Sequence, residues 1–198
     1  MKYMNEWFQP IENDDREFFI LEKSKPIYDL DRAGKKKLKE GTTDMFRIKD
    51  GIHIITPYIV HKAVVQHEVR KKVFQNVGTI LDKYDLDSKY HEIFDEAVIQ
   101  KNNWQLYGST KPFKEPYKVT KILRVWEDRI ENVVLDKYSD RELVELLSMR
   151  NKDDEAYTSI LHGHVEERVY ILDEEYSNKK GGRLISRRKN NWNTGKSW

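Results

Sequence analysis

Residues 95–112 read DEAVIQKNNWQLYGSTKP, a stretch that sets three kinds of chemical group close together in the chain. Asp95 lies in an apolar, helix-like face, Trp104 to Gly108 alternate as a short strand does, and Lys111 follows the Gly108-Ser109 turn. A bound metal–phosphate group needs an anion for the metal, backbone N–H groups and a cation, so this stretch is a candidate site for one. The alternative is a surface aspartate, a tight turn and a solvated lysine, because turn chemistry of this kind is common.

The composition is that of one ordinary folded domain. The chain of 198 residues is long enough to bury a core, and an aromatic content of 12% argues against disorder. The formal net charge is only +2, so any binding of nucleic acid must come from local basic patches. The absence of cysteine excludes disulfides, thiolate zinc sites and cysteine nucleophiles. No apolar run approaches the roughly 20 residues of a membrane span, so we expect a soluble, intracellular protein without a membrane partner.

Hydrophobic periodicity predicts a mixture of strands and helices. Strands are expected at 27–31, 51–57, 117–126 and 130–135, and helices at 58–84, 90–99 and 140–149. The apolar run 18–21 is expected to form a buried strand or a turn of helix. The last helix is predicted by a capping box formed by Ser139 and Glu142. Residues 32–49 are rich in lysine and are expected to form a solvated loop. From residue 151 the pattern loosens, so we expect a core over 1–150 and a loosely ordered extension over 151–198 that ends in a basic tail.

Two carboxylates and a histidine are further candidates for a site. Asp29 and Asp31 lie two apart in a segment expected to be extended, so both point to one side and could hold one or two divalent cations. His53 alternates with Ile52 and Ile54, so we expect it to face away from the core that the isoleucines enter and toward a site. An imidazole there could donate a hydrogen bond to a triphosphate. The alternative for His53 is a core histidine whose hydrogen bonds are satisfied.

Two longer phrases and the aspartates, taken in order, resemble the archaeo-eukaryotic primase superfamily. The phrases are KDGIHIITP at 49–57 and KNNWQLYGSTKP at 101–112. They are most similar to the primase domain in the primase-helicases of large nucleocytoplasmic DNA viruses, of poxvirus and mimivirus type. Asp29-Leu30-Asp31, Gly51-Ile52-His53 and Asp95 stand in the family's order of motifs, and the chain is identified as a truncated member.

This resemblance implies a fold, a reaction and a set of site residues. The fold would be α+β, an RRM-like antiparallel sheet with flanking helices, incomplete in a truncated chain. The residues implied are metal-holding catalytic carboxylates, Asp29, Asp31 and Asp95, and phosphate-binding residues, His53, Ser109 and Lys111. The reaction would be template-directed primer synthesis with Mg²⁺ or Mn²⁺, using an NTP or dNTP on single-stranded nucleic acid. The resemblance also implies a separate helicase as a partner. It implies a location at the viral replication site in the host cytoplasm.

The sequence leaves two functions open. His53 follows Asp31 by only 22 positions, whereas viral members have a longer interval, so the chain has lost a segment or the match of the two aspartates is accidental. The alternative to an active primase is a catalytically inactive remnant that binds nucleic acid by charge and by stacking on Trp104 or Tyr107. The charge would come from a basic tail and a set of lysines, Lys35, Lys36, Lys37, Lys114, Lys118 and Lys121.

Overall fold

The computed structural model describes most of the first three quarters of the chain and one helix beyond it. The described residues are 6–8, 16–59, 61–84, 86–100, 107–110, 114–126, 129–148 and 163–179. None of the helices within these ranges is long and apolar enough to span a bilayer.

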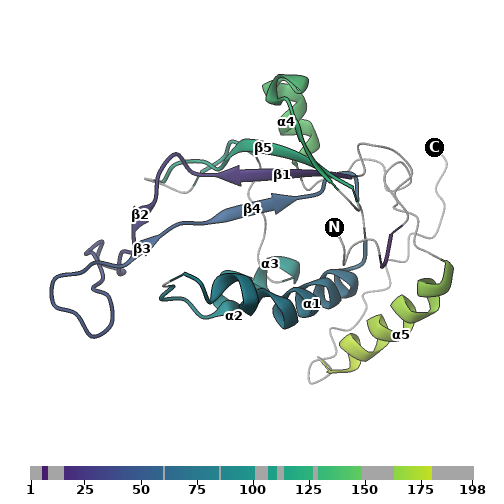
Figure 1. The fold of residues 1–198 in the computed structure, drawn as a ribbon, viewed down its shortest axis with the longest axis horizontal. Helices are drawn as coiled ribbons and strands as arrows, with labels where there is room; N and C mark the ends of the chain where they lie inside the picture. Colours follow the sequence, from purple (N-terminus) through teal and green to yellow (C-terminus); the bar gives the residue numbers. More distant parts are fainter. Residues whose placement is uncertain are drawn as a thin grey trace, which may run out of the picture.

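A four-stranded antiparallel sheet forms the centre of the fold (Figure 1). The strands are β1 (Glu17–Glu22), β4 (Ile52–Ile55), β5 (Lys118–Val125) and β6 (Ile130–Val133), and they lie in the order β4-β1-β5-β6. The register sets Leu21 opposite both His53 and Val119, and Phe19 opposite both Ile55 and Ile122. The α+β fold with an antiparallel sheet is therefore confirmed, including the hairpin of β5 and β6.

One face of this sheet is covered by a short helix, α4 (Asp140–Leu146). Residues two apart in a strand share a face, and β1 buries alternate residues, among them Phe19 and Leu21. These side chains pack with Ile122 and with Leu143 and Leu147 from the α4 segment. The helix begins at the predicted capping box, in which the side chain of Ser139 accepts a hydrogen bond from the backbone N–H of Glu142.

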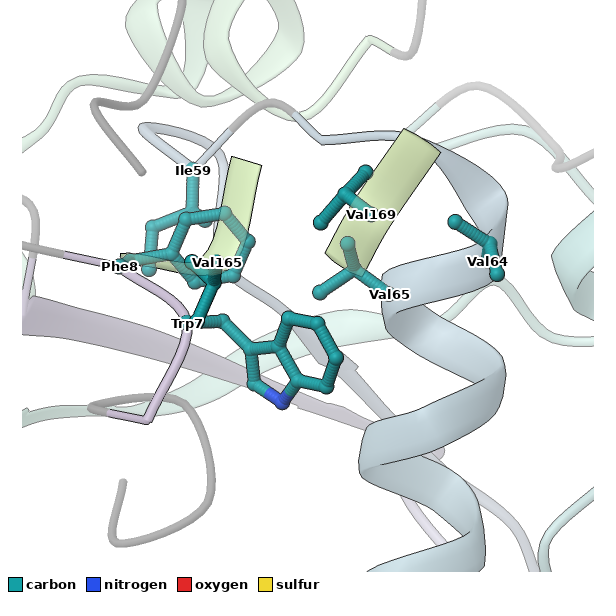
Figure 2. Close-up of a cluster of buried hydrophobic side chains, with 7 residues drawn as sticks. All are labelled: Trp7, Phe8, Ile59, Val64, Val65, Val165 and Val169. Atoms are coloured by element: carbon teal, nitrogen blue, oxygen red, sulfur yellow. The ribbon is translucent and has the colours of Figure 1, made fainter. Parts of the chain in front are cut away.

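A second core joins helix α1 (Ala63–Leu81) to helix α5 (Gly163–Lys179) (Figure 2). Val165 and Val169 lie four apart, so both project from one face of α5, and they pack with Val65 and the N-terminal Trp7. Helix α5 falls in the segment that we expected to be loosely ordered, and the charged residues around these valines hide their spacing. The boundary between a core over 1–150 and an extension over 151–198 stays a prediction.

An arm leaves the sheet between β1 and β4 and extends to the left in Figure 1. It is built from β2 (Ile27–Tyr28) and β3 (Ile48–Lys49), which pair in antiparallel register, and two isolated bridges continue the pairing. The segment 32–49 is exposed along most of its length, as predicted, but isolated bridges fold it back on itself and its last two residues form β3. Gly34 and Gly41 adopt positive φ angles, at 80° and 77°, and they let the chain turn back on itself.

The helix expected over 90–99 is broken in two. Helix α2 (Tyr90–Ile93) and helix α3 (Ala97–Gln100) are separated by Asp95, whose carboxylate accepts a hydrogen bond from the backbone N–H of Ala97 at 2.8 Å. Aspartate competes with the helical backbone for such donors, which explains the break. A one-turn 3₁₀ helix, η2 (Leu135–Lys137), links β6 to α4.

Candidate functional site

His53 lies on β4, an edge strand, at the end of the sheet from which the arm leaves. It stands beside Leu21 across the ladder, and it shares the face that Phe19 and Leu21 bury. The predicted orientation was wrong. Ile52 and Ile54 are the exposed residues of β4, at 58% and 57%, while His53 is half-buried. Helix α4 covers the side of the sheet on which His53 lies, and this decides which face of β4 is buried. The alternation of residues within β4 does not show on which side a helix will pack.

An aromatic neighbour holds the His53 imidazole in place. The ring stacks on Tyr117, with centroids 3.9 Å apart and an angle of 17° between the planes. The ammonium of Lys23 lies 4.9 Å from the centroid of the same Tyr117 ring. Burial, and to a lesser degree the charge of Lys23, lower the pKa of His53 below its usual value. The group at neutral pH is thus a neutral imidazole with one N–H donor, beside a lysine cation.

The position of Tyr117 against His53 requires a glycine at residue 51. A Cβ built at position 51 would lie 2.7 Å from the hydroxyl oxygen of Tyr117, a distance that real Cβ atoms essentially never show. Any side chain at this position would therefore push the tyrosine from its place over His53.

Ser109 lies in a turn that is anchored near this end of the sheet. The Tyr107 hydroxyl accepts a hydrogen bond from the backbone N–H of Val119 at 3.3 Å, and Gly108 turns the chain with a φ of 77°. Thr110 donates to the backbone carbonyl of Lys114 and so closes the loop. Ser109 itself is exposed. The predicted phosphate ligand Lys111 lies outside the described residues, as do residues 104–106 of the strand predicted over 104–108, and its residues 107 and 108 lie in the turn.

Asp29 is surrounded by cations of the protein itself. Its carboxylate is 4% exposed and lies 3.0 Å from Lys49 Nζ, 3.4 Å from Lys37 Nζ and 3.9 Å from Arg47 Nε. A hydrogen bond from Lys49 holds the pKa of this carboxyl below its usual value, although burial opposes the shift. The negative charge that a divalent cation would need is already compensated by these ion pairs.

Asp31 and Asp95 are exposed and serve the local backbone. Asp31 Oδ1 accepts hydrogen bonds from the backbone N–H groups of Ala33 and Lys35, both at 2.9 Å, and so builds the turn of the arm. Asp95 begins α3. Across the described part of the chain, no three carboxylate or histidine side chains come together in a way that could hold a metal ion. The three predicted ligands thus do not form one cluster in this structure, and their role as metal ligands stays a prediction.

Comparison with protein families matches residues 1–123 to a family described as the C962R protein N-terminal AEP domain, where AEP stands for archaeo-eukaryotic primase. This match covers more than half of the chain. The chain belongs to the C962R-type AEP family. A relative named "Putative helicase L207/L206", from Acanthamoeba polyphaga mimivirus, is 30% identical over 112 residues. That alignment covers 56% of this chain and 10% of the relative. No solved structure matches the chain.

The AEP match confirms the resemblance drawn from the two sequence phrases, and the phrase at 49–57 is the one that carries His53. Two neighbours of His53 were missed, Lys23 and Tyr117. Lys23 directly follows β1 and Tyr117 directly precedes β5. Both are brought to His53 by the pairing of β1 with β4 and β5. Both residues lie next to the ends of predicted strands, which is the signal that the sequence offers. The order of the strands in the sheet must be known before this signal places them beside His53.

Proposed function

We propose that this AEP-family chain binds the phosphates of a nucleotide beside His53 and brings a nucleic-acid strand to them, as the substrate-binding part of a primase-type nucleotidyltransferase. The observation that supports it most is the His53–Tyr117 stack beside Lys23. A triphosphate at this position would accept a hydrogen bond from the imidazole N–H and would lie beside the positive charge of the Lys23 ammonium. Hydrogen bonds in which one partner is charged are stronger than those between neutral groups.

Charge gives this proposal a pH signature. An anion next to His53 favours the imidazolium, so bound phosphate raises the pKa that burial and Lys23 have lowered. Binding then takes up a proton, and affinity for a nucleoside triphosphate should fall as the pH rises above the range in which the imidazole titrates. The terminal phosphate of the ligand also titrates near neutral pH, so the part due to the protein is the difference between the parent and a histidine variant.

Calorimetric titration of the full chain with ATP or dATP tests the proposal. His53→Ala should weaken binding at least tenfold and should remove the protein's share of the pH dependence. His91→Ala is the matched control, because His91 is an exposed histidine on α2 and lies outside the site. Equal affinity of the His53→Ala variant and the parent would refute the assignment of His53.

Primer synthesis itself is the second candidate, and membership of the AEP family favours it. In this candidate Mg²⁺ or Mn²⁺ is held by Asp29, Asp31 and Asp95, with Ser109 and Lys111 as further phosphate ligands. Asp29 would have to exchange its lysine partners for the metal ion, and Asp95 would have to leave its place at the start of α3. The name of the mimivirus relative suggests a helicase as the partner of such a primase.

A primer-synthesis assay on a single-stranded template, with either metal, separates the two candidates. Asp95→Ala should abolish synthesis while far-UV circular dichroism shows the parent fold. Synthesis by this variant at the parent rate would contradict the metal assignment. Nucleotide binding without synthesis in the parent chain would leave the binding function as the account of this protein.

A further inference from the structure

The arm between β1 and β4, residues 27–49, concentrates positive charge. It carries seven lysine and arginine residues against four aspartate and glutamate residues, a formal net charge of +3, while the whole chain carries +2. The arm is therefore a local concentration of positive charge, separate in sequence from the basic C-terminal residues 179–198, and it could attract a polyanion. The arm also projects from the sheet, which leaves its surface accessible (Figure 1).

Six of the arm's seven cations form two sets, and the seventh, Lys39, pairs with Asp87. Lys37, Arg47 and Lys49 surround the buried carboxylate of Asp29 in the stem. The second set, called the tip set here, consists of Arg32, Lys35 and Lys36 at and beside the turn that Asp31 builds. All three are exposed, and within the described ranges no carboxylate lies within ion-pair distance of them. A cation without an acidic neighbour loses no ion pair when it meets a phosphate. The tip set is therefore the part of the arm best suited to an external anion.

Aromatic rings accompany these cations. Tyr28 and Phe46 are 45% and 44% exposed, and they meet edge to face with centroids 5.9 Å apart. The Lys36 ammonium lies 3.7 Å from the centroid of Tyr28 and 5.3 Å from that of Phe46. Exposed rings that stack on bases, next to cations that meet phosphates, are what proteins use to bind single strands.

The arm joins the sheet close to His53 along the chain. Lys39 forms an ion pair with Asp87 at 2.8 Å, which ties the arm to the loop after α1. Lys49 ends β3, and His53 follows it by four positions in β4. A strand bound along the arm would thus lead toward the proposed phosphate site.

We propose that the arm, residues 27–49, binds single-stranded nucleic acid through the tip cations and the Tyr28–Phe46 pair. Asp29 is the positioning residue that holds the stem cations together beneath this surface. The inference rests on the proposed function in one respect, that the bound strand runs from the arm toward the phosphate site at His53. Binding of the strand itself uses residues of the arm alone.

Anisotropy of fluorescein-labelled oligothymidylate, measured with the full chain over a range of salt concentrations, tests the inference. The arm variant replaces the three tip cations, as Arg32→Ala, Lys35→Ala and Lys36→Ala. The control removes the same charge from three exposed cations that do form ion pairs, at the N-cap of α1, on α1 and on α4, as Lys62→Ala, Lys71→Ala and Arg141→Ala. Circular dichroism verifies that both variants keep the parent fold.

Counterion release sets the expected size of the effect. Each phosphate contact adds about 0.7 to the slope of log affinity against log salt on a single strand, so three lost contacts lower the slope by about 2. Between about 50 and 200 mM salt, the parent should then lose roughly 20-fold more affinity than the arm variant. The control variant should keep the parent slope.

Two further measurements separate the explanations. Phe46→Leu keeps an apolar side chain but removes the ring, so it should weaken binding to the single strand and leave binding to a duplex of the same length unchanged. Equal weakening of both would overturn the stacking part. An arm variant with the parent salt slope, or a control variant with the same loss, would overturn the inference as a whole. Triphosphate binding that survives in the arm variant would leave the proposed function standing in either case.

Discussion

Replacing Gly51 by alanine perturbs the contact on which the His53 site depends. The new Cβ would lie 2.7 Å from the Tyr117 hydroxyl oxygen, so the ring must shift. Its stack on His53, at 3.9 Å between centroids, is then lost. An aromatic pair contributes about 0.5–1.5 kcal/mol, and overpacking costs about 1–3 kcal/mol. We therefore expect Gly51→Ala to lower the free energy of unfolding by about 1–3 kcal/mol, measured by urea denaturation.

Tyr117→Phe is the matched rescue for this change, because it removes only the hydroxyl oxygen. In the double variant the nearest ring atoms lie 3.8 Å and 4.0 Å from the new Cβ, which is ordinary van der Waals contact. A double-mutant cycle should thus be strongly non-additive, with the double variant recovering most of the lost stability. A double variant that is as unstable as Gly51→Ala would refute the reasoning, since the hydroxyl would not be the obstacle.

The same substitution should move the titration of His53. Burial and Lys23 lower the pKa of this imidazole in the folded chain, so the unfolded chain binds its proton more readily. The stability that His53 contributes is therefore present above the unfolded pKa, near 6.5, and is lost as the pH falls through the lowered folded pKa. Gly51→Ala loosens the packing, so NMR should show the pKa rising toward 6.5. An unchanged titration would contradict the account of the stack.

Three further outcomes are expected from other parts of the fold. Glu17→Gln should destabilise the protein by about 2–4 kcal/mol in urea, because Glu17 is fully buried and two cations and a tyrosine hydroxyl contact its carboxylate. Ser139→Ala should cost about 1 kcal/mol by loss of the α4 cap, and a stability equal to the parent's would contradict the capping box. Lys49 holds the pKa of Asp29 below 3.8, so the stability from Asp29 persists above that pH and is lost as the pH falls through the lowered value. Acid unfolding followed by circular dichroism should accordingly be shallower for Asp29→Asn than for the parent, and identical curves would count against the ion pairs.

Local patterns predicted the elements of the fold well, because they report on local physics. The strands around His53 and Ile122, the long helix α1 and the cap at Ser139 all follow from periodicity or from short-range hydrogen bonds. Helix α5 was missed because charged residues surround its buried valines. The break at Asp95 was missed because apolar spacing continues through it.

The candidate site depended on contacts that no local pattern contains. The orientation of His53 was predicted wrongly, since β4 is an edge strand and the helix that covers one face comes from far along the chain. The spacing of Asp29 and Asp31 says nothing of Lys49, which the arm folds back onto Asp29. A pair of aspartates two apart is compatible with a metal site or with an ion-paired stem, and the ion pairs of Asp29 depend on the pairing of β2 with β3, which that spacing does not contain.

The most direct test of the central claim is the NMR signal of the His53 imidazole during titration of the full chain with a nucleoside triphosphate. The account predicts a saturable shift of this signal, with a rise in the pKa of His53, and a strong weakening of the effect in Lys23→Ala. A His53 signal that stays unmoved while the triphosphate binds elsewhere on the chain would contradict it.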